Sequence, residues 1–536
     1  MKKLAFAIVI ILTSFSIATV YGNTKTSDAS NFMAPDQVLR QTMAGKKLMP
    51  IDKTILANFF KKHPYLKTYQ LEVNSLYKKR NYTWIWHDKE GLIEFAYLLY
   101  SKANRLEEEG LKSSLPYKDK IDGIFDGESK NKLSKTDTEL LLSSMYVYYV
   151  QKVYQGIDSK KTTEIGWFIP RKNLSYTNLL DSLLVDASLL DKNANHLLGQ
   201  YYKLREKLKE YRQIEKNGGW DSIKMEPSIR DYKPDDTSKV IGQIRKRLAI
   251  TGDLKQDSKS NCYDEELMAG VLDYKRRNGF KLNYHIDSDH VENMNISVGE
   301  RIKTIMVNME RCRWIDPELA KADEFIVINI PSFKLFYIKN GVRELESKVF
   351  VGKNMTETVI FSGNINQIVF SPYWNVPKSI IDNELKFAMD QDKNYLASNN
   401  MEWNNGNVRQ KPGPKNSLGL VKFMFPNSNS IYLHDTPVKS LFDVETRAFS
   451  HGCINMEKAK ELAVLILKDD PNWPIERINV AMNGEKETSY FLKKPIPVHI
   501  SYFTASVDDS GIINFYRDIY QRDHRLAELL FTDDFK

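Results

Sequence analysis

The chain has 536 residues, of which 42% are hydrophobic and 27% charged, an ordinary globular composition that excludes a disordered or largely membrane-embedded protein. This length has room for three or four domains, since single cores stop growing near about 250 residues. The formal net charge is +8, but the charges are mixed along the chain, with no basic block interleaved with aromatic residues, which argues against nucleic-acid binding.

The N-terminus has the pattern of a secretory signal peptide. Two lysines precede an apolar run over residues 4–20, which ends among small residues. We therefore expect a leader over residues 1–22 that is cleaved on export, followed by a polar linker over residues 23–35. An uncleaved membrane anchor is the alternative, because the run is close to the shortest length that spans a bilayer.

A helical pattern follows the linker, and we predict a helical domain over residues 36–235. Within it, the segment 136–156 opens with the capping-box spacing from Thr136 to Glu139 and closes at Gly156. The aromatic and aliphatic residues of this segment favour a place in the core over a binding function.

A group of short helices is predicted next. Three segments each carry one apolar face: 238–254, 264–280 and 297–314. We assign residues 236–300 to a small helical domain and residues 301–323 to a connecting helix and linker. Such a small domain is either a binding module or a spacer.

From Glu324 onward the pattern changes to that of β-strands. Residues 324–352 are rich in Ile, Val, Phe and Tyr and contain a turn around Gly341. The strand pattern breaks over residues 378–408, where a helical and then a polar stretch predicts an insertion. We expect a mostly β domain over 324–485, and a C-terminal extension, residues 486–536, that packs on the other domains.

The chain has three cysteines, which raises the question of a reactive thiol. In an oxidising compartment cysteines tend to pair, so a disulfide between Cys262 and Cys312 would leave Cys453 free. Two unrelated buried thiols are an equally good interpretation of that pair. Cys453 ends the tetrapeptide Ser450-His451-Gly452-Cys453, and fifteen residues separate this motif from His434. That spacing suits two strands and a loop that bring the two ends together.

Three kinds of site are compatible with a thiol and two imidazoles. A metal site would have only three ligands, His434, His451 and Cys453, without the paired spacings typical of zinc, so we expect no metal and no other cofactor. Buried structural residues are the second possibility. A nucleophile is the third, because an imidazole can take the thiol proton and the glycine frees backbone N–H groups for an oxyanion pocket. The third interpretation fits the motif best.

This motif resembles the signature of the L,D-transpeptidase (YkuD-type) catalytic domain. Further segments stand in the order seen in the large periplasmic L,D-transpeptidases: "RNYTWIW", "MYVYYVQKVYQG", "NMERCRWI", "SPYWNVPKSI", "RQKPGPKNSLGLVKFMFPN" and "IYLHDTP". The implied fold is multidomain α+β. It has a helical scaffold domain, a small three-helix peptidoglycan-binding-like domain, and a mostly β L,D-transpeptidase catalytic domain with a helical capping insertion.

The resemblance implies roles for individual residues. Cys453 is implied as the nucleophile and His434 as the general base and acid, with the N–H groups of Gly452 and Cys453 in the oxyanion pocket. Other residues are implied to shape the site or to bind substrate: Ser450, His451 and Asn455 for the first role, Tyr432 and Trp374 for the second.

The implied function is peptidoglycan cross-linking in the periplasm. Cys453 would attack the third residue of a donor tetrapeptide stem, release D-alanine and pass the acyl group to an acceptor amine, which joins two third residues. The implied partners are peptidoglycan stem peptides and other cell-wall enzymes, with no nucleic acid and no stable membrane span. Two alternatives stay open: water as the acceptor, as in an L,D-carboxypeptidase or endopeptidase, and a non-catalytic wall-binding scaffold.

Two segments bear on how far the resemblance extends. Similar small helical modules show Phe-Gln and later Asp-Gly, where this chain has Tyr274-Lys275 and Asn283-Tyr284, so glycan binding by this domain is left open. The flanks of residues 378–408 resemble segments that border the family's cleft. We therefore predict that this insertion is a lid, with a dispensable ornament as the alternative.

Overall fold

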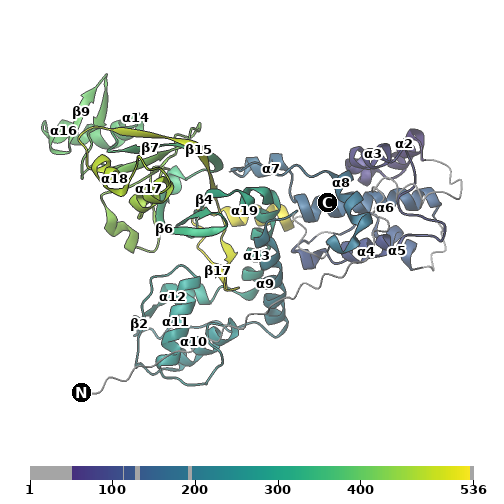
Figure 1. The fold of residues 1–536 in the computed structure, drawn as a ribbon. Helices are drawn as coiled ribbons and strands as arrows, with labels where there is room; N and C mark the ends of the chain where they lie inside the picture. The colour runs from purple at the N-terminus through teal and green to yellow at the C-terminus, as the bar shows by residue number, and fades with distance from the viewer. Residues whose placement is uncertain (1–50, 113, 127–132, 191–195, 532–536) are drawn as a thin grey trace, which may run out of the picture.

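The computed structural model describes residues 51–112, 114–126, 133–190 and 196–531. The predicted signal peptide and linker lie outside these ranges. Figure 1 shows three bodies: a helical N-terminal body drawn in purple and blue, a small helical one in teal, and a β-rich one drawn mainly in green. This multidomain α+β architecture confirms the predicted fold class.

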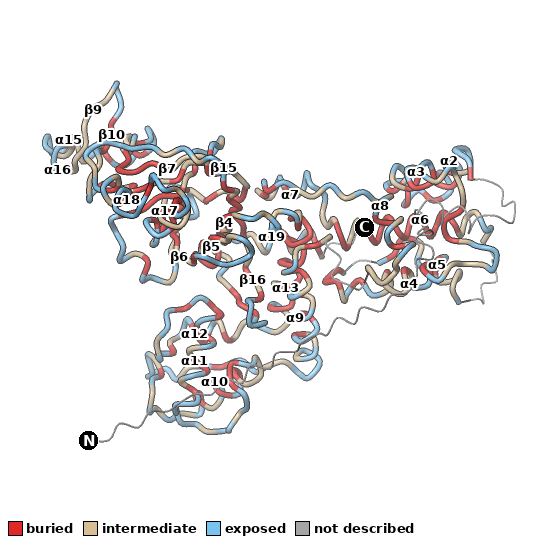
Figure 2. Tube along the Cα trace, viewed as in Figure 1, coloured by how far each residue is buried: buried red, intermediate tan, exposed pale blue. Residues whose placement is uncertain are grey.

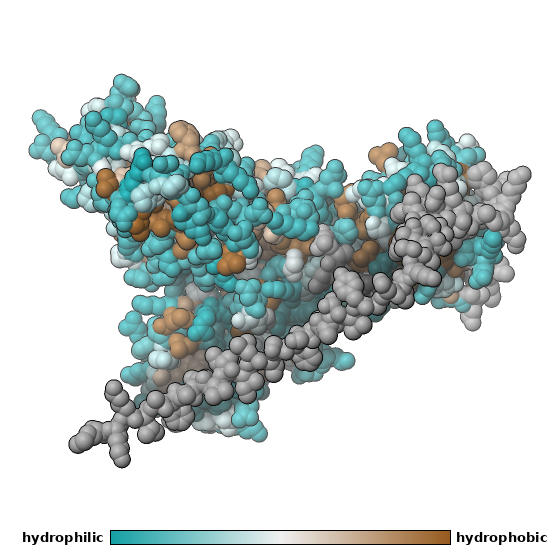
Figure 3. Space-filling model, in the orientation of Figure 1, coloured by the Kyte–Doolittle hydropathy of each residue, from teal (hydrophilic) through white to brown (hydrophobic). Residues whose placement is uncertain are grey.

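The face seen in Figure 3 is largely hydrophilic, with hydrophobic residues in small scattered patches. Across the described ranges, no helix is both long and apolar enough to cross a membrane.

The N-terminal body packs its helices around a central helix, α6 (Lys135–Val150). Every residue of α6 from Glu139 to Val150 is buried, so the helix is enclosed on all sides rather than on one face (Figure 2). The helices in contact with it are α2 (Lys53–Lys62), α3 (Gln70–Lys79), α4 (Glu94–Ala103) and α5 (Lys118–Phe125). Further along the chain come α7 (Ser159–Glu164), α8 (Tyr176–Val185) and α9 (Gly199–Lys216).

Helix α6 begins before the predicted capping box. Ser134 is the N-cap, and its hydroxyl accepts the Asp137 N–H at 2.9 Å. Glu139 is fully buried instead, where its carboxylate accepts the Trp86 N–H at 3.1 Å. The predicted cap at Thr136 was wrong because residue spacing alone cannot distinguish an exposed capping carboxylate from a buried one.

The small helical body has its own core, built from residues between Ile223 and Met294. Its helices are α10 (Lys239–Ile250), α11 (Glu265–Arg277) and α12 (Ser288–Met294). The third predicted helical segment, 297–314, forms α13 (Val298–Trp314), most of which falls in the predicted connecting helix and linker of residues 301–323. This helix packs against α9 and belongs to the main core. Figure 1 shows α9 and α13 in the middle of the molecule, where the three bodies meet.

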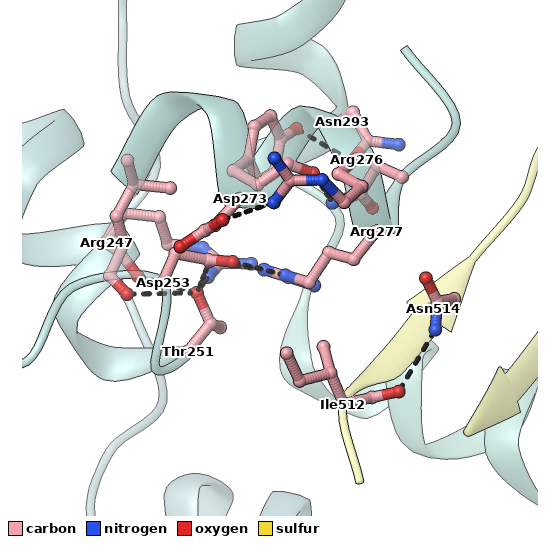
Figure 4. Close-up of polar contacts among 12 residues, drawn as sticks. Arg247, Thr251, Asp253, Asp273, Arg276, Arg277, Asn293, Ile512 and Asn514 are labelled. Carbon is pink, nitrogen blue, oxygen red and sulfur yellow. Dashed lines mark hydrogen bonds and ion pairs between the residues drawn. The ribbon is translucent and has the colours of Figure 1, made fainter. Parts of the chain in front are cut away.

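A buried ion pair fastens the small helical body near its contact with the C-terminal hairpin. Arg277 binds both carboxylate oxygens of Asp253, at 2.5 Å for the Nη2 to Oδ2 pair, and Thr251 donates to the same carboxylate at 2.7 Å. Figure 4 shows this pair near Ile512 and Asn514 of the hairpin, where Asn514 lies in a strand and Ile512 directly precedes it. The hairpin strands are β16 (Ala505–Val507) and β17 (Ile513–Phe515). A buried pair of this kind requires both partners, because either charge alone would be left unpaired away from water.

The β-rich body contains one large sheet. Its strand order is β1 (Trp167–Phe168), β7 (Ile360–Phe370), β11 (Val421–Met424), β12 (Leu433–His434), β14 (Ile454–Met456), β6 (Val342–Gly352), β5 (Lys334–Lys339), β4 (Glu324–Asn329) and β15 (Thr488–Ser501). Strand β15 pairs with both β4 and β7, so this order closes into a ring. Helices α17 (Ala459–Leu467) and α18 (Ile475–Met482) pack against it.

The sheet extends beyond the predicted limits of the β domain. Strand β1 comes from the N-terminal body and pairs in parallel with β7. Strand β15 lies past residue 485, so the predicted boundary falls too early. The hydrophobic pattern typical of a strand is weak after residue 485, because the first half of β15 is largely exposed and burial becomes nearly continuous only from Ile496. The following helix, α19 (Arg522–Phe531), packs on α13.

The predicted insertion forms a compact unit with its own small core. Its sheet has the order β8 (Trp374–Asn375), β10 (Asn407–Gln410) and β9 (Met401–Asn404). Its helical part consists of α14 (Lys378–Ile380), the π-helical turn η7 (Ile381–Leu385), α15 (Lys386–Gln391) and α16 (Tyr395–Ser398). Its core residues are Val376, Ile380, Leu385 and Val408. The unit is therefore slightly longer than the predicted 378–408.

Candidate active site

The candidate nucleophile and base come from adjacent parallel strands. Strands β12 and β14 pair with His434 opposite Asn455, and the Ile454 N–H donates to Tyr432 O at 3.2 Å. Cys453, just before β14, therefore lies opposite Tyr432. Since alternate residues of a strand share a face, Tyr432, His434 and Cys453 are brought to one side of the sheet.

The thiol of Cys453 is held in its uncharged form. The side chain is half-buried, and the thiol donates to Ser430 O with an Sγ to O distance of 3.6 Å. Burial raises the pKa of Cys453, and hydrogen bonds from the backbone and hydroxyl of Tyr432 counteract part of this effect. Because the thiolate is the nucleophilic form, the site needs a base to take the proton.

His434 has the properties of such a base. The side chain is 5% exposed, and its Nδ1 lies 2.6 Å from Asp435 O. Burial lowers the pKa of His434 to about 4, although hydrogen bonds to the backbone of Asp435 and the charge of that residue act in the opposite direction. The imidazole is therefore neutral at pH 7. With Nδ1–H donating to the carbonyl, Nε2 is the nitrogen that can accept a proton.

Tyr432 contacts both the candidate base and the candidate nucleophile. Its ring lies 5.5 Å from the His434 ring, between centroids, and its hydroxyl interacts with the Cys453 thiol. Burial raises the pKa of Tyr432 well above its ordinary value, so the phenol stays neutral. Tyr432 thus lies at the centre of the site, where the sequence predicts a substrate-binding residue.

Asp435 orients the candidate base and was missed in the sequence. Its carboxylate accepts the Leu420 N–H at 2.9 Å and pairs with Lys439 at 2.5 Å. Gly419 leaves room for this carboxylate, since a Cβ there would lie 2.4 Å from Asp435 Oδ2 and its φ is +63°. These contacts fix the backbone whose carbonyl binds His434. The available signal was an Asp directly after the histidine, together with the Gly419 turn.

Ser450 organises the catalytic loop, residues 450–453. Its hydroxyl accepts the Gly452 N–H at 3.2 Å and donates to Cys453 O at 2.5 Å. Gly452 has a φ of +110°, in the region that favours glycine. The Gly452 N–H, one of the two predicted oxyanion donors, is thus engaged by Ser450 in this conformation.

The remaining predicted residues lie around the site in different environments. His451 is exposed, and its Nε2 lies 2.7 Å from Glu384 Oε1 of the insertion. Asn455 is buried opposite His434. Trp374 lies in the small sheet of the insertion, where it pairs with Gln410, rather than on β12 or β14.

The other two cysteines are unrelated thiols in this structure. Cys262 is exposed and Cys312 is buried, and both are free. The alternative of two separate thiols therefore holds, although only one of them is buried. No cluster of three or more His, Cys, Asp or Glu suited to a metal ion occurs among the residues that the structure describes.

Two family models match separate parts of the chain. Residues 323–478 match the model described as the L,D-transpeptidase catalytic domain, and residues 71–208 match the model described as the Scaffold domain. Together they cover most of the β-rich body, without its strand β15, and most of the N-terminal helical body.

A curated protein from Haemophilus influenzae, described as "Putative L,D-transpeptidase", is 36% identical to this chain over 227 residues. The match covers 38% of this chain and 46% of that protein, so it spans less than half of the relative's length.

Solved structures give weaker likenesses. An L,D-transpeptidase from Mycobacterium smegmatis is 12% identical, with a TM-score of 0.20, covering 34% of this chain and 59% of that chain. An L,D-transpeptidase from Stackebrandtia nassauensis is 13% identical, with a TM-score of 0.21, covering 50% of this chain and 94% of that chain. TM-scores this low carry no argument about the reaction.

Proposed function

We propose that this chain cross-links peptidoglycan stems through a thioester on Cys453. The match of residues 323–478 to the L,D-transpeptidase catalytic domain supports the proposal. The observation that supports this most is the parallel pairing of β12 with β14, which brings a neutral imidazole and a thiol to one face of the sheet. We also propose export through a cleaved leader over residues 1–22, into the periplasm where the substrate lies.

In the first step, the Cys453 thiol gives its proton to His434 Nε2 as the sulfur attacks the carbonyl carbon of the third stem residue. The tetrahedral oxyanion then collapses, the bond from this carbon to the D-alanine nitrogen breaks, and His434 returns the proton to the leaving amine. The products are free D-alanine and a thioester. The neutral resting states of both groups mean that the ion pair forms only as the substrate reacts.

In the second step, an acceptor amine on another stem attacks the thioester carbon. His434 takes the proton that this nitrogen loses, the bond from carbon to sulfur breaks, and Cys453 recovers its proton. The result is an amide that joins two third residues, with no net change at the enzyme. Water in place of the amine would give a hydrolysed stem, which is the competing outcome.

The insertion is proposed to favour the amine over water. Glu384 of the insertion contacts His451, which lies two residues before the nucleophile. A closed lid over a thioester limits access of water to the reacting carbon. The same contact supports a role for the insertion in meeting an incoming acceptor stem.

The test is to incubate the purified full-length enzyme with a disaccharide-tetrapeptide and identify the products by mass. Release of D-alanine together with a third-to-third cross-linked dimer is the expected result. Hydrolysed stems without dimers would assign the chain to the hydrolases instead. If the wild-type enzyme releases no more D-alanine than Cys453→Ala does, catalysis is refuted and a wall-binding scaffold is favoured.

A further inference from the structure

A short segment outside the site described above supports the catalytic loop from behind. This backing segment, residues 352–358, follows strand β6 and lies against the loop. Its Thr356 hydroxyl donates to Ser450 O at 3.0 Å, and its Thr358 hydroxyl donates to Gly452 O at 2.9 Å. Two carbonyls of the catalytic loop are therefore held from the same side.

The bond from Thr358 also controls the direction of a neighbouring N–H group. The Gly452 carbonyl shares one planar peptide unit with the Cys453 N–H, and in a trans peptide the two groups point in opposite directions. A hydrogen bond that fixes the carbonyl therefore aims the N–H. Since the Gly452 N–H is bonded to Ser450, the Cys453 N–H is the donor that this loop can offer to an oxyanion next to the sulfur.

Thr358 is fixed in turn by Tyr520, a residue of the C-terminal extension. The Tyr520 hydroxyl donates to Gly352 O at 2.6 Å and accepts the Thr358 N–H at 3.2 Å. The Thr358 hydroxyl accepts the Gly352 N–H at 2.9 Å. Thr358 is fully buried and Tyr520 is 7% exposed, so each hydroxyl has one orientation in which its donor and acceptor are both used.

The protonation of Tyr520 is secure at neutral pH. Burial raises the pKa of Tyr520 to about 12, so the hydroxyl keeps the proton that it donates to Gly352 O. The chain of bonds from Tyr520 through Thr358 to Gly452 is therefore intact wherever the enzyme would work.

A second contact joins the backing segment to the N-terminal body. Arg522 pairs with Glu357 at 2.6 Å and donates to the carbonyls of Ile165 and Gly166 at 3.2 and 3.3 Å. Gly166 has a φ of +82°, and a Cβ there would lie 2.8 Å from the Arg522 guanidinium, so this approach requires glycine. The backing segment is thus anchored outside the catalytic domain at both Tyr520 and Arg522.

We propose that Thr358 and Tyr520 are positioning residues for acyl transfer, which fix the Gly452–Cys453 peptide so that the Cys453 N–H faces the oxyanion. Neither residue touches the reacting atoms. This inference deepens the proposed function, and it depends on that function only for the identity of the natural acyl donor. Any acyl group that enters at Cys453 forms the same oxyanion.

The test compares two reactions of Cys453 in the full-length chain. Acylation by a small β-lactam passes through a tetrahedral oxyanion, whereas alkylation by iodoacetamide is a displacement at a saturated carbon and forms none. Both rates are measured from the mass of the adduct on Cys453. The variants are Thr358→Val, which keeps the shape and removes the hydroxyl, Thr358→Ser, which keeps the hydroxyl, and Tyr520→Phe.

We expect Thr358→Val to slow acylation roughly 10- to 100-fold, somewhat less than outright loss of an oxyanion donor. Alkylation should stay within about twofold of wild type, because it uses no such donor. Thr358→Ser should restore acylation, and Tyr520→Phe should slow it about 3- to 10-fold, since it acts through Thr358. The matched control is Tyr490→Phe, which removes a hydroxyl bonded to Asp470 at 2.7 Å and should change neither rate.

Several outcomes would overturn the inference. These are an unchanged acylation rate in Thr358→Val, an equal loss of both rates, and failure of Thr358→Ser to recover acylation. If Thr358→Val does not fold, the ratio of the two rates in Tyr520→Phe decides the question. A wild-type enzyme that is acylated by the β-lactam but never releases D-alanine from a tetrapeptide would refute the proposed function and leave this inference standing.

Discussion

The catalytic loop and the capping insertion lie next to each other but are attached in different ways. The loop is held by a buried hydrogen bond from Thr358 and a partly buried one from Ser450, and it continues into strand β14. The insertion, residues 374–410, has a separate small core and meets the loop through the pair Glu384–His451. The two side chains of this pair are 49% and 42% exposed, and such pairs contribute only about 0–1 kcal/mol.

Under the proposed function, the loop and the insertion have different tasks, and each is attached in a way that suits its task. Groups that perform bond-making need fixed geometry, and buried networks supply it. A lid must open and close, which favours a weak and solvent-exposed contact. The insertion also exposes two large aromatic residues, Phe387 at 75% and Trp403 at 59%.

The largest expected effect concerns the catalytic loop. Cys453→Ala should abolish the acyl adduct with a β-lactam and all D-alanine release, because no other thiol lies in the loop. Mass spectrometry of the intact protein measures the first effect, and product analysis the second. An adduct that persists in this variant would move the nucleophile elsewhere, and Cys262→Ala is the control that removes an exposed thiol outside the site.

His434→Ala should slow both steps by roughly 10²–10⁴-fold, the usual contribution of a general acid and base. Its effect should exceed that of His451→Ala, whose ring faces the insertion. Single-turnover acylation and deacylation rates provide the measurement, with circular dichroism to establish that both variants fold. If His451→Ala had the larger effect with its fold intact, the assignment of the base would be reversed.

The buried state of His434 also predicts a pH-dependent stability. Its pKa is lowered to about 4 from an ordinary 6.5, so between these values the unfolded chain binds a proton that the folded chain does not. The stability from this group is therefore present above about pH 6.5 and is lost as the pH falls toward 4, by about 3 kcal/mol in total.

Thermal unfolding of wild type and His434→Gln between pH 7 and pH 4 measures this effect. The melting temperature of the variant should fall less steeply with decreasing pH than that of the wild type. Burial also lowers the pKa of His499 to about 4. This residue remains in both proteins, so it contributes equally to the pH dependence of their stability. Parallel slopes would show that His434 is not buried as a neutral group.

Replacement of residues 378–408 by a short Gly/Ser linker tests whether the insertion acts as a lid. The Val376 N–H donates to Val408 O at 2.9 Å, so the ends of the excised segment lie close together. Acylation by a small β-lactam should persist, while products shift from cross-links toward hydrolysed stems by about tenfold, as expected if a lid excludes water. An unchanged product ratio would identify the insertion as ornament.

Glu384→Gln gives the smallest effect and sharpens the comparison further. It keeps the size of the side chain but removes the charge opposite His451, so the hydrolysed fraction should rise by about two- to fivefold, in proportion to the small energy of an exposed pair. Acylation of Cys453 should not change. A matched substitution at the outer part of the insertion, Glu402→Gln, should leave the product ratio as it is. A large loss of acylation in Glu384→Gln would mean that this carboxylate supports the loop itself.

Features that depend on local pattern could be predicted from the sequence. The Ser450 to Cys453 motif, the glycine before the nucleophile and the spacing to His434 predicted the candidate site, and strand-forming residues from Glu324 predicted the β-rich body. All of these are signals between residues close in the chain, where geometry follows from spacing.

Features that depend on residues distant in the chain became visible only in the folded structure. It buried Glu139, moved α13 into the main core, made β15 a central strand, and brought Thr358 against Gly452 and Tyr520, which are 94 and 162 residues away. The sequence shows that a residue carries a hydroxyl or a carboxylate, but not whether this group lies in water or in a buried network. Its role is set by which segments fold against it, because the free energy of a polar group depends on its burial and its partners rather than on its neighbours in sequence.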